Sequence, residues 1–357
     1  MPTLWDTSYT REELLSRVGS MDQVGGARRL RWEEGPEDAM LAAEMRTGAG
    51  LNLWISPTRG LDITHAEYKG VPLAWRSRTG DVHSAYFEPP GMGWLRGFFG
   101  GLITTCGLTY LGAPGTDREE ELGIHGRISY TAARNVLVDN DWDGDDYVMR
   151  VQGRLTESTV FGNTLVLTRC ISARLGEPRF FVHDSVENRG REPSPFMLLY
   201  HVNIGFPLVH RDSRILLPTD HVEPRDEAAQ VGREHYDRFE DPTPDYAERV
   251  YFHAMKPNSA GRVQAAVVNP TIRDGVGVYL RYDPLELPCF TEWKMMNSDE
   301  YVVGLEPGNC LPLGRAVERS EGRLRTLEPG EVQEFHLEFG VLDGAQAIQS
   351  FDQAMRS

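Results

Sequence analysis

From about residue 28 onward, the chain is a succession of short runs of alternating or β-branched residues, separated by Gly, Pro, Asn and Asp. Strand side chains point alternately to two faces, and turn residues interrupt strands, so this texture predicts strand after strand. Almost no segment has a sustained helical period, and we find no repeat of roughly 20–50 residues that would indicate a propeller. We therefore expect an all-β sandwich or barrel. Clear examples of the runs are 51–56, 147–152, 164–169, 179–186, 263–269, 277–282 and 331–339.

Two segments depart from this texture. Residues 10–18 predict a short helix, with Thr10 as its N-cap and Glu13 as the capping-box partner. The polar, Pro- and Asp-rich segment 221–248 is either a linker between two domains or a long surface loop or lid. We favour the loop because the strand pattern resumes unchanged after it. The expected organisation is an N-terminal extension over 1–29 and one β-sandwich domain over 30–357.

A further polar run, 139–146, superficially resembles a calcium-binding EF-hand loop. The carboxylate that such a loop needs at its twelfth position is missing, so we expect a hairpin turn there.

Composition limits the partners of the chain. A formal net charge of −16 argues against nucleic acid or an anionic membrane as the main partner, because both would repel the average surface. The four cysteines are widely spaced without a CxxC pair, so we expect reduced, mostly buried thiols. No basic start precedes an apolar stretch, and no run approaches 18 apolar residues, which predicts a cytoplasmic protein that binds a small molecule. A monomer and a homodimer fit equally well.

One glutamate and two histidines occupy similar settings in distant parts of the chain. Glu306 ends an apolar, strand-like run and is followed at once by Pro and Gly, so a sheet edge should hold it rigidly. His125 stands in Gly-Ile-His-Gly, and His201 stands in Leu-Leu-Tyr-His-Val-Asn before Gly-Phe-Pro. Carboxylate and imidazole groups are the common general acids and bases, so this set predicts a convergent acid/base site.

Five motifs extend this pattern: Arg59-Gly-Leu-Asp62-Ile, Gly100-Gly-Leu-Ile-Thr-Thr-Cys106-Gly-Leu, His125-Gly-Arg127, Tyr200-His-Val-Asn203-Ile-Gly-Phe-Pro207, and Trp293-Lys294 through Asn309. In this order, over roughly residues 30–340, the chain resembles the aldose 1-epimerase (galactose mutarotase-like) superfamily, in a branch of uncharacterised bacterial proteins. The resemblance implies a β-supersandwich that holds a sugar on its concave face. It also implies a His that acts as general acid on the ring oxygen and a Glu that acts as general base on the anomeric hydroxyl.

Carried onto this chain, the resemblance makes His201 the acid, Glu306 the base and His125 a substrate-binding histidine. Asn203 and Asn309, which belong to the same motifs, are further predicted substrate-binding residues. One departure is Tyr200, which precedes His201 where mutarotases have Asn.

Three other residues have no counterpart in the common mutarotase pattern: Arg59, Asp62 and Lys294. We expect them to border the same cleft and select the substrate. The alternative for Arg59 and Asp62 is a simple pair beside the bend at Gly60, and the alternative for Lys294 is a solvated side chain. Strand alternation places Lys294 and Glu292 on one face with Trp293 opposite. Most of the remaining histidines are expected at the surface: His65, His83, His210, His221, His235 and His253.

The expected activity is interconversion of the anomers of a reducing sugar or sugar derivative, without metal or organic cofactor. One alternative is an epimerase, isomerase or lyase on a keto- or acidic sugar, with Lys294 stabilising an enolate or holding an anion. A second is a carbohydrate-binding protein without catalysis, because a fold does not establish chemistry. A third is a metal held by His125, His201 and Glu306, for which the sequence offers no local ligand spacing.

Overall fold

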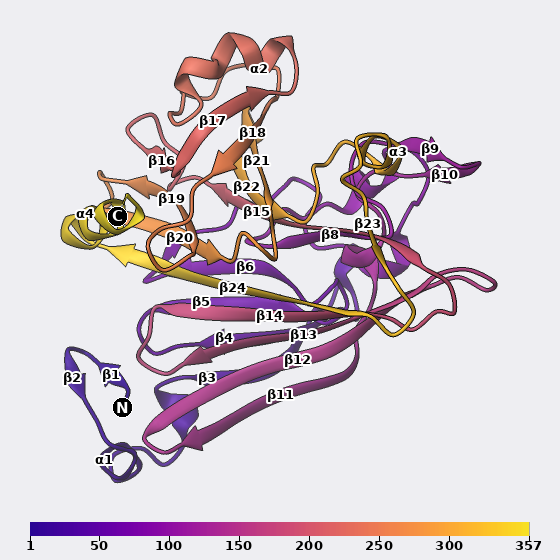
Figure 1. Ribbon diagram of the computed structural model, residues 1–357. Helices are drawn as coiled ribbons and strands as arrows, with labels where there is room; N and C mark the ends of the chain where they lie inside the picture. Colours follow the sequence, from indigo (N-terminus) through magenta and orange to yellow (C-terminus); the bar gives the residue numbers. More distant parts are fainter. Residues whose placement is uncertain (357) are drawn as a thin grey trace.

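The computed structural model describes residues 1–356, and antiparallel sheets dominate it (Figure 1). The strand β14 (Arg179–Asn188) illustrates why these runs become strands. Its Phe180, Val182 and Val186 are buried, while the residues between them point outward, including the exposed His183. This alternation buries one face of the strand against a core and leaves the other face wet. The predicted all-β class is confirmed.

The largest sheet has eight strands in the order β11-β12-β13-β14-β24-β20-β19-β16. Its strands are β11 (Arg134–Asp143), β12 (Asp146–Ser158), β13 (Thr164–Arg174), β14, β24 (Val332–Asp343), β20 (Val276–Tyr282), β19 (Val263–Asn269) and β16 (Arg214–Leu216). The predicted hairpin turn at 139–146 joins β11 to β12, with Asp143 opposite Asp146, and is confirmed.

A second sheet carries the candidate site. Its strand order is β17-β18-β21-β22-β15-β23, with β8 also paired to β15. These strands are β17 (Thr219–Pro224), β18 (Arg249–Met255), β21 (Cys289–Met296), β22 (Tyr301–Gly308), β15 (Ser194–Gly205), β23 (Arg325–Leu327) and β8 (Thr104–Leu108). Eleven of the twelve residues of β15 are buried, so both of its faces are covered.

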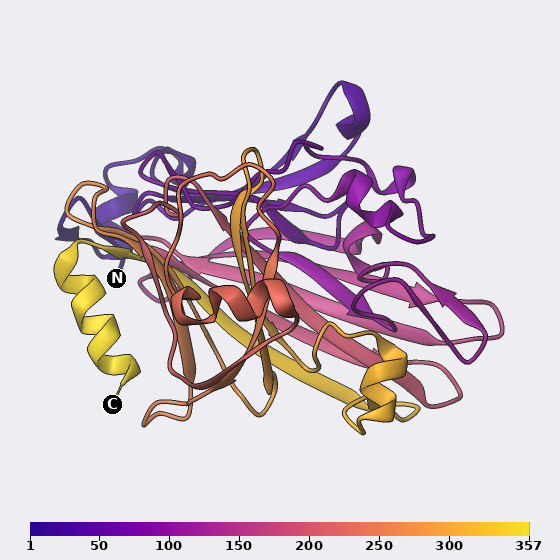
Figure 2. The same ribbon diagram turned by 90° about the horizontal axis from the view of Figure 1, so that it is seen from above.

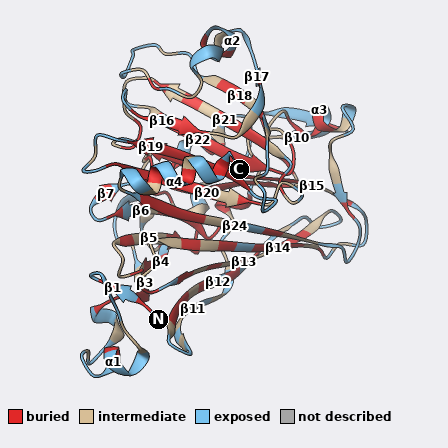
Figure 3. Cartoon of the chain, turned by 60° about the vertical axis from the view of Figure 1, so that its left-hand side comes forward, coloured by how far each residue is buried: buried red, intermediate tan, exposed pale blue. Residues whose placement is uncertain are grey.

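A third sheet has five strands in chain order, and two short hairpins stand apart from it. The five are β3 (Gly26–Arg31), β4 (Leu41–Arg46), β5 (Leu51–Ser56), β6 (Asp62–Tyr68) and β7 (Val71–Pro72). The hairpins are β1 (Thr3–Leu4) with β2 (Thr7–Ser8), and β9 (Gly115–Asp117) with β10 (Glu120–Leu122). One apolar core draws on all three large sheets: Leu53 of the five-stranded sheet, Val182 of the eight-stranded sheet and Leu305 of the sheet with β15 (Figure 3).

Helices are short and lie outside the sheets (Figure 2). The helix α1 (Arg11–Leu15) has the predicted capping box: Glu13 N–H donates to Thr10, and Thr10 N–H donates to the Glu13 carboxylate. The others are α2 (Glu227–Gly232), α3 (Arg315–Ser320) and α4 (Ala345–Met355), with 3₁₀ turns η1 (Met21–Gln23), η2 (Gly35–Glu37), η3 (Ser84–Tyr86), η4 (Gly93–Gly97), η5 (Ile128–Tyr130) and η6 (Arg233–His235). The polar segment 221–248 thus contains α2 and η6. None of the helices in the described part of the chain has the length and apolarity to cross a bilayer. All four cysteines are free thiols, of which Cys106 and Cys310 are buried, as expected, whereas Cys170 and Cys289 are half-buried.

Candidate active site

Strand register brings His201 and Glu306 together. In the pairing of β15 with β22, Val202 lies opposite Leu305 and Asn203 opposite Gly304, which sets His201 beside Glu306 on one face. We call this the front face of the sheet and the opposite one the back face. His201 Nε2 lies 3.1 Å from Glu306 Oε1, and both side chains are less than a tenth exposed. We call these two residues the front pair.

A glycine makes room for the carboxylate. Gly304 lies two residues before Glu306 on the same strand face. A Cβ at residue 304 would come within 2.4 Å of Glu306 Oε1 and 3.2 Å of Trp293 Cβ. Any side chain there would displace Glu306 from His201.

A left-handed turn delivers His125. Its φ of 58° is followed by 75° at Gly126, where a Cβ would come within 2.4 Å of the Gly107 and Tyr110 carbonyl oxygens. His125 N–H donates to Gly112 O, and Gly107 N–H donates to His125 O, so the backbone fixes the turn against β8. The His125 ring centroid consequently lies 6.1 Å from that of His201.

Aromatic rings surround the imidazoles. The His201 ring lies edge-to-face with Phe98 and with Trp293, each at a centroid distance of 5.4 Å. The His125 ring makes the same contact with Trp94 at 5.1 Å. Trp94 and Phe98 come from the loop around η4, whereas Trp293 comes from β21. Sequence reasoning missed Trp94 and Phe98, although aromatic residues in the Gly-rich stretch 91–101 were the available signal.

This enclosure disfavours charge on the front pair. Burial lowers the pKa of His201 to about 3, with a smaller contribution from the nearby His125, and burial lowers the pKa of His125 to about 4. Burial likewise raises the pKa of Glu306 well above its ordinary range; Glu248 adds to this rise and Arg225 opposes it. At neutral pH the free pair therefore holds one proton, as a carboxylic acid beside a neutral imidazole.

Two charged residues stand beside this face. The indole Nε1 of Trp293 donates to Glu248 Oε2 at 3.0 Å, and Arg225 donates to Glu248 Oε1 at 2.9 Å. Arg225 also contacts Asp226 at 2.7 Å. Glu248 therefore joins the end of the polar segment 221–248 to an aromatic ring of the site.

Arg59 does not pair with Asp62, and it does not contact the front pair. Its guanidinium is fully buried and donates to three backbone carbonyls, Ser129 O at 2.7 Å, Val82 O at 2.6 Å and Gly97 O at 3.0 Å. It also lies 3.8 Å from the centroid of the Tyr130 ring. Arg59 thus ties together the loops that carry the aromatic rings, in contrast to its predicted place at the border of the cleft.

Asp62 belongs to a second buried network. Its carboxylate accepts from Thr105 Oγ1 at 2.7 Å and from Arg169 at 2.9 Å. Arg169 also contacts Asp184 at 2.6 Å, and Asp184 accepts the Tyr200 hydroxyl at 2.7 Å. Asp62 therefore supports the junction of the three large sheets, and it too differs from its expected position.

The two asparagines brace the backbone around the front pair. Asn203 Nδ2 donates to the carbonyls of Gly100, Gly101 and His201 at 3.0–3.2 Å. Asn309 Oδ1 accepts from Leu198 N–H at 2.7 Å. Both side chains are buried, so their described partners are backbone groups.

Lys294 lies on the back face, with Glu292 as expected and opposite to the front pair. Its buried ammonium contacts Glu240 at 2.7 Å and donates to the backbone carbonyls of His235 and Arg238. Lys294 therefore anchors the segment 221–248, and the predicted contact with substrate has no support from this placement.

The sequence also hid a second buried pair on the back face. His253 Nε2 lies 3.1 Å from Glu292 Oε2, with no exposure of either side chain. His253 was expected at the surface, but Tyr236 covers it with an edge-to-face ring contact at 5.2 Å. We call His253 and Glu292 the back pair.

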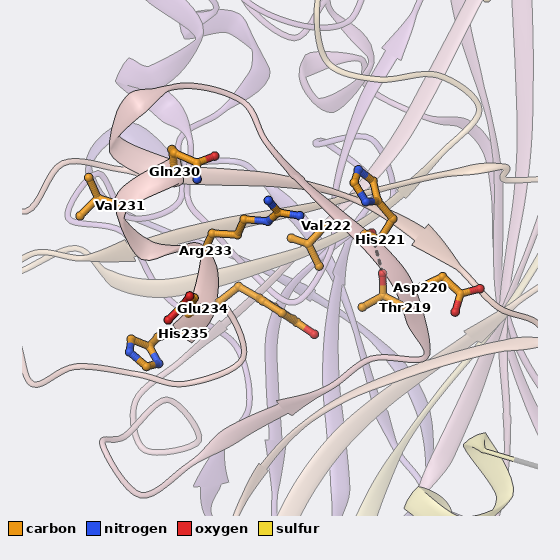
Figure 4. A pocket seen from close by; sticks show the side chains of 10 residues that line it. Thr219, Asp220, His221, Val222, Gln230, Val231, Arg233, Glu234 and His235 are labelled. Carbon is orange, nitrogen blue, oxygen red and sulfur yellow. Dashed lines mark hydrogen bonds between the residues drawn. The ribbon is translucent and has the colours of Figure 1, made fainter.

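A solvent-open hollow of about 610 Å³ lies between β17 and the α2–η6 segment (Figure 4). Its lining includes His221, Arg233 and Glu234, but neither His201 nor Glu306. We place the acid/base site at the front pair because three buried titratable groups converge there, whereas the hollow is lined mainly by exposed side chains.

Comparison with solved structures defines the class of this protein. The chain has the fold of the galactose mutarotase-like proteins. It is 26% identical to a Klebsiella pneumoniae protein described as a "putative aldose 1-epimerase", with a TM-score of 0.88 over 94% of this chain and 89% of that one. A galactose mutarotase-like protein from Clostridium acetobutylicum and a galactose 1-epimerase from Lactobacillus acidophilus are each 14% identical, with TM-scores of 0.60 and 0.57. Both alignments cover 89% of this chain and 99% of the other.

The family itself carries no assigned activity. The chain belongs to the family described as "Domain of unknown function (DUF4432)", whose model matches residues 37–341. No curated protein sequence matches the chain.

Proposed function

We propose that this protein interconverts the anomers of a reducing sugar or sugar derivative, with His201 and Glu306 as its acid/base pair. The observation that carries the proposal is the 3.1 Å approach of these two groups, from distant strands, on the face enclosed by aromatic rings. The fold shared with mutarotase-like proteins supports it.

Anomer exchange requires two coupled proton movements. The ring oxygen gains a proton while the anomeric hydroxyl loses one, the ring opens, and closure on the other face reverses both transfers. The two oxygens are bonded to the same carbon, so an acid and a base on neighbouring atoms reach both. A pair that holds one proton at neutral pH supplies one donor and one acceptor.

The position of that proton in the free site differs from the expected roles. The resemblance makes His201 the donor and Glu306 the acceptor, whereas burial favours a protonated Glu306 and a neutral His201. The two forms contain the same number of protons and interconvert by one transfer within the pair. Sugar hydroxyls that hydrogen-bond to the pair then select the reactive form.

The surrounding residues suit a sugar. Trp293, Trp94 and Phe98 offer aromatic surface to the C–H groups of a pyranose or furanose ring. His125, neutral at pH 7 and close to His201, offers a ring nitrogen to a hydroxyl group. By contrast, the lyase or isomerase alternative depended on Lys294, which lies on the back face and is fully buried.

The test is exchange spectroscopy by NMR on neutral, acidic and phosphorylated reducing sugars. We expect accelerated exchange between the α and β anomers of at least one class, with unchanged carbon skeleton. Glu306→Gln and His201→Asn should each remove most of the acceleration. Binding without acceleration in every class would contradict the proposal and leave a carbohydrate-binding protein. An unsaturated or rearranged product would instead assign a lyase or isomerase.

A further inference from the structure

Two histidines meet on the outer, solvent-facing side of the eight-stranded sheet. β14 and β24 are neighbours, and His183 lies directly opposite His336 in their register (Figures 1 and 3). The two rings stack with centroids 4.4 Å apart and an interplanar angle of 16°. Both side chains are about half exposed, so the cluster is open to solvent.

A carboxylate completes a group of three ligand atoms. Glu334 lies two residues before His336 on the same face of β24, and its Oε2 is 2.5 Å from His183 Nε2. One ligand atom each from His183, Glu334 and His336 all lie within 4.8 Å of one another. Small rotations of exposed side chains bring such atoms to a common ion.

A fourth residue orients His336. The Glu286 carboxylate contacts His336 Nδ1 at 2.8 Å and also accepts the backbone N–H of His336 at 2.7 Å. A carboxylate at Nδ1 holds the proton there and leaves the lone pair of Nε2 free. Metal-binding histidines have this arrangement, with a carboxylate on the nitrogen that does not bind the ion.

We propose that His183, Glu334 and His336 bind a divalent transition metal ion, with Zn²⁺ as the best match. Two imidazoles and one carboxylate suit Zn²⁺ better than Mg²⁺ or Ca²⁺, which prefer oxygen ligands. Water fills the remaining coordination position. The ion displaces the proton that His183 and Glu334 share, so binding weakens as pH falls. The site is on a different sheet from the front pair and does not depend on the proposed function.

The experiment is calorimetric titration of the full-length, chelator-treated protein with ZnCl₂, together with the visible absorption of added Co²⁺. We expect saturable binding of one ion and a Co²⁺ spectrum of a low-coordinate site. His183→Ala or His336→Ala should abolish saturable binding, and Glu286→Gln should weaken it about 10–100-fold. His221→Ala, an exposed histidine in the hollow of Figure 4, is the matched control and should bind normally.

Thermal unfolding gives an independent readout. Excess Zn²⁺ should raise the Tm of the native chain but not that of the His183→Ala/His336→Ala double variant, because only a ligand of the folded state stabilises it. Absence of saturable binding to the native chain would overturn the proposal. Unchanged binding in the double variant would also overturn it, as would loss of binding in His201→Asn, which would place the ion at the front pair.

Discussion

The front pair and the back pair present the same chemistry on opposite faces of one sheet. Each places a histidine Nε2 3.1 Å from a glutamate oxygen, and burial raises the pKa of both carboxylates. Both pairs also contain ring nitrogens and carboxylate oxygens without a hydrogen-bond partner in the described chain. Residue type, distance and unfilled bonding capacity therefore do not separate a site from a brace.

What separates the two pairs is their surroundings. The back pair is completely inaccessible, and Lys294 on the same face holds the covering segment by its backbone. The front pair keeps slight exposure and lies among rings from mobile-length loops, with His125 as a third titratable group. We therefore assign chemistry to the front pair and stabilisation to the back pair.

The largest expected effect comes from removing one carboxylate from each face. Glu306→Gln should lower kcat/KM for anomer exchange by about 10²–10⁴-fold, because the amide can neither give nor take the proton. Glu292→Gln is the matched control and should change kcat/KM of the folded protein little. NMR exchange rates measure both, and an equal loss in the two variants would remove the distinction.

A steric change can disturb the front pair without altering its chemistry. Gly304→Ala should lower kcat/KM on the order of 10²-fold, because the added Cβ meets Glu306 Oε1 and misplaces the carboxylate. Gly19→Ala, where the new Cβ has nothing within 4 Å, serves as the control. Wild-type rates in Gly304→Ala would show that the position of Glu306 does not matter.

Lys294→Met tests the back face. Its placement changes the expectation from loss of substrate capture to loss of stability, about 1–3 kcal/mol in the free energy of unfolding, because two carbonyls and Glu240 lose a donor. KM should stay unchanged. Urea denaturation and steady-state kinetics on the same preparation measure both, and a raised KM with normal stability would return the lysine to the substrate.

The smallest effect concerns pH. Burial lowers the folded-state pKa of His125 from 6.5 to about 4, so the unfolded chain binds the proton more readily. The stability tied to this group is present above pH 6.5 and is lost as pH falls toward 4. His125→Asn, which tolerates the left-handed backbone, should therefore show a weaker loss of stability over that window. Urea midpoints from pH 4 to 7 provide the measurement, and parallel curves would contradict it.

The strands, the α1 cap and the meeting of His201 with Glu306 follow from local pattern and motif. Alternation also placed Glu292 and Lys294 on one face correctly, because the period of a strand is local. It could not tell which face of the sheet meets the aromatic loops, since that depends on packing. Arg59 and Asp62 illustrate the same limit: they are close in sequence, yet their main partners lie tens of residues away.

The contacts of Arg59 have a consequence for how the site can diversify. Its guanidinium holds residues 82, 97 and 129 through carbonyl oxygens, which every amino acid possesses. Side chains along these loops are free to vary while the clamp persists, provided that the backbone path is kept. Related proteins can thus acquire different sugar preferences by exchanging wall residues around an unchanged arginine, and loop grafts between them should preserve loop length before sequence.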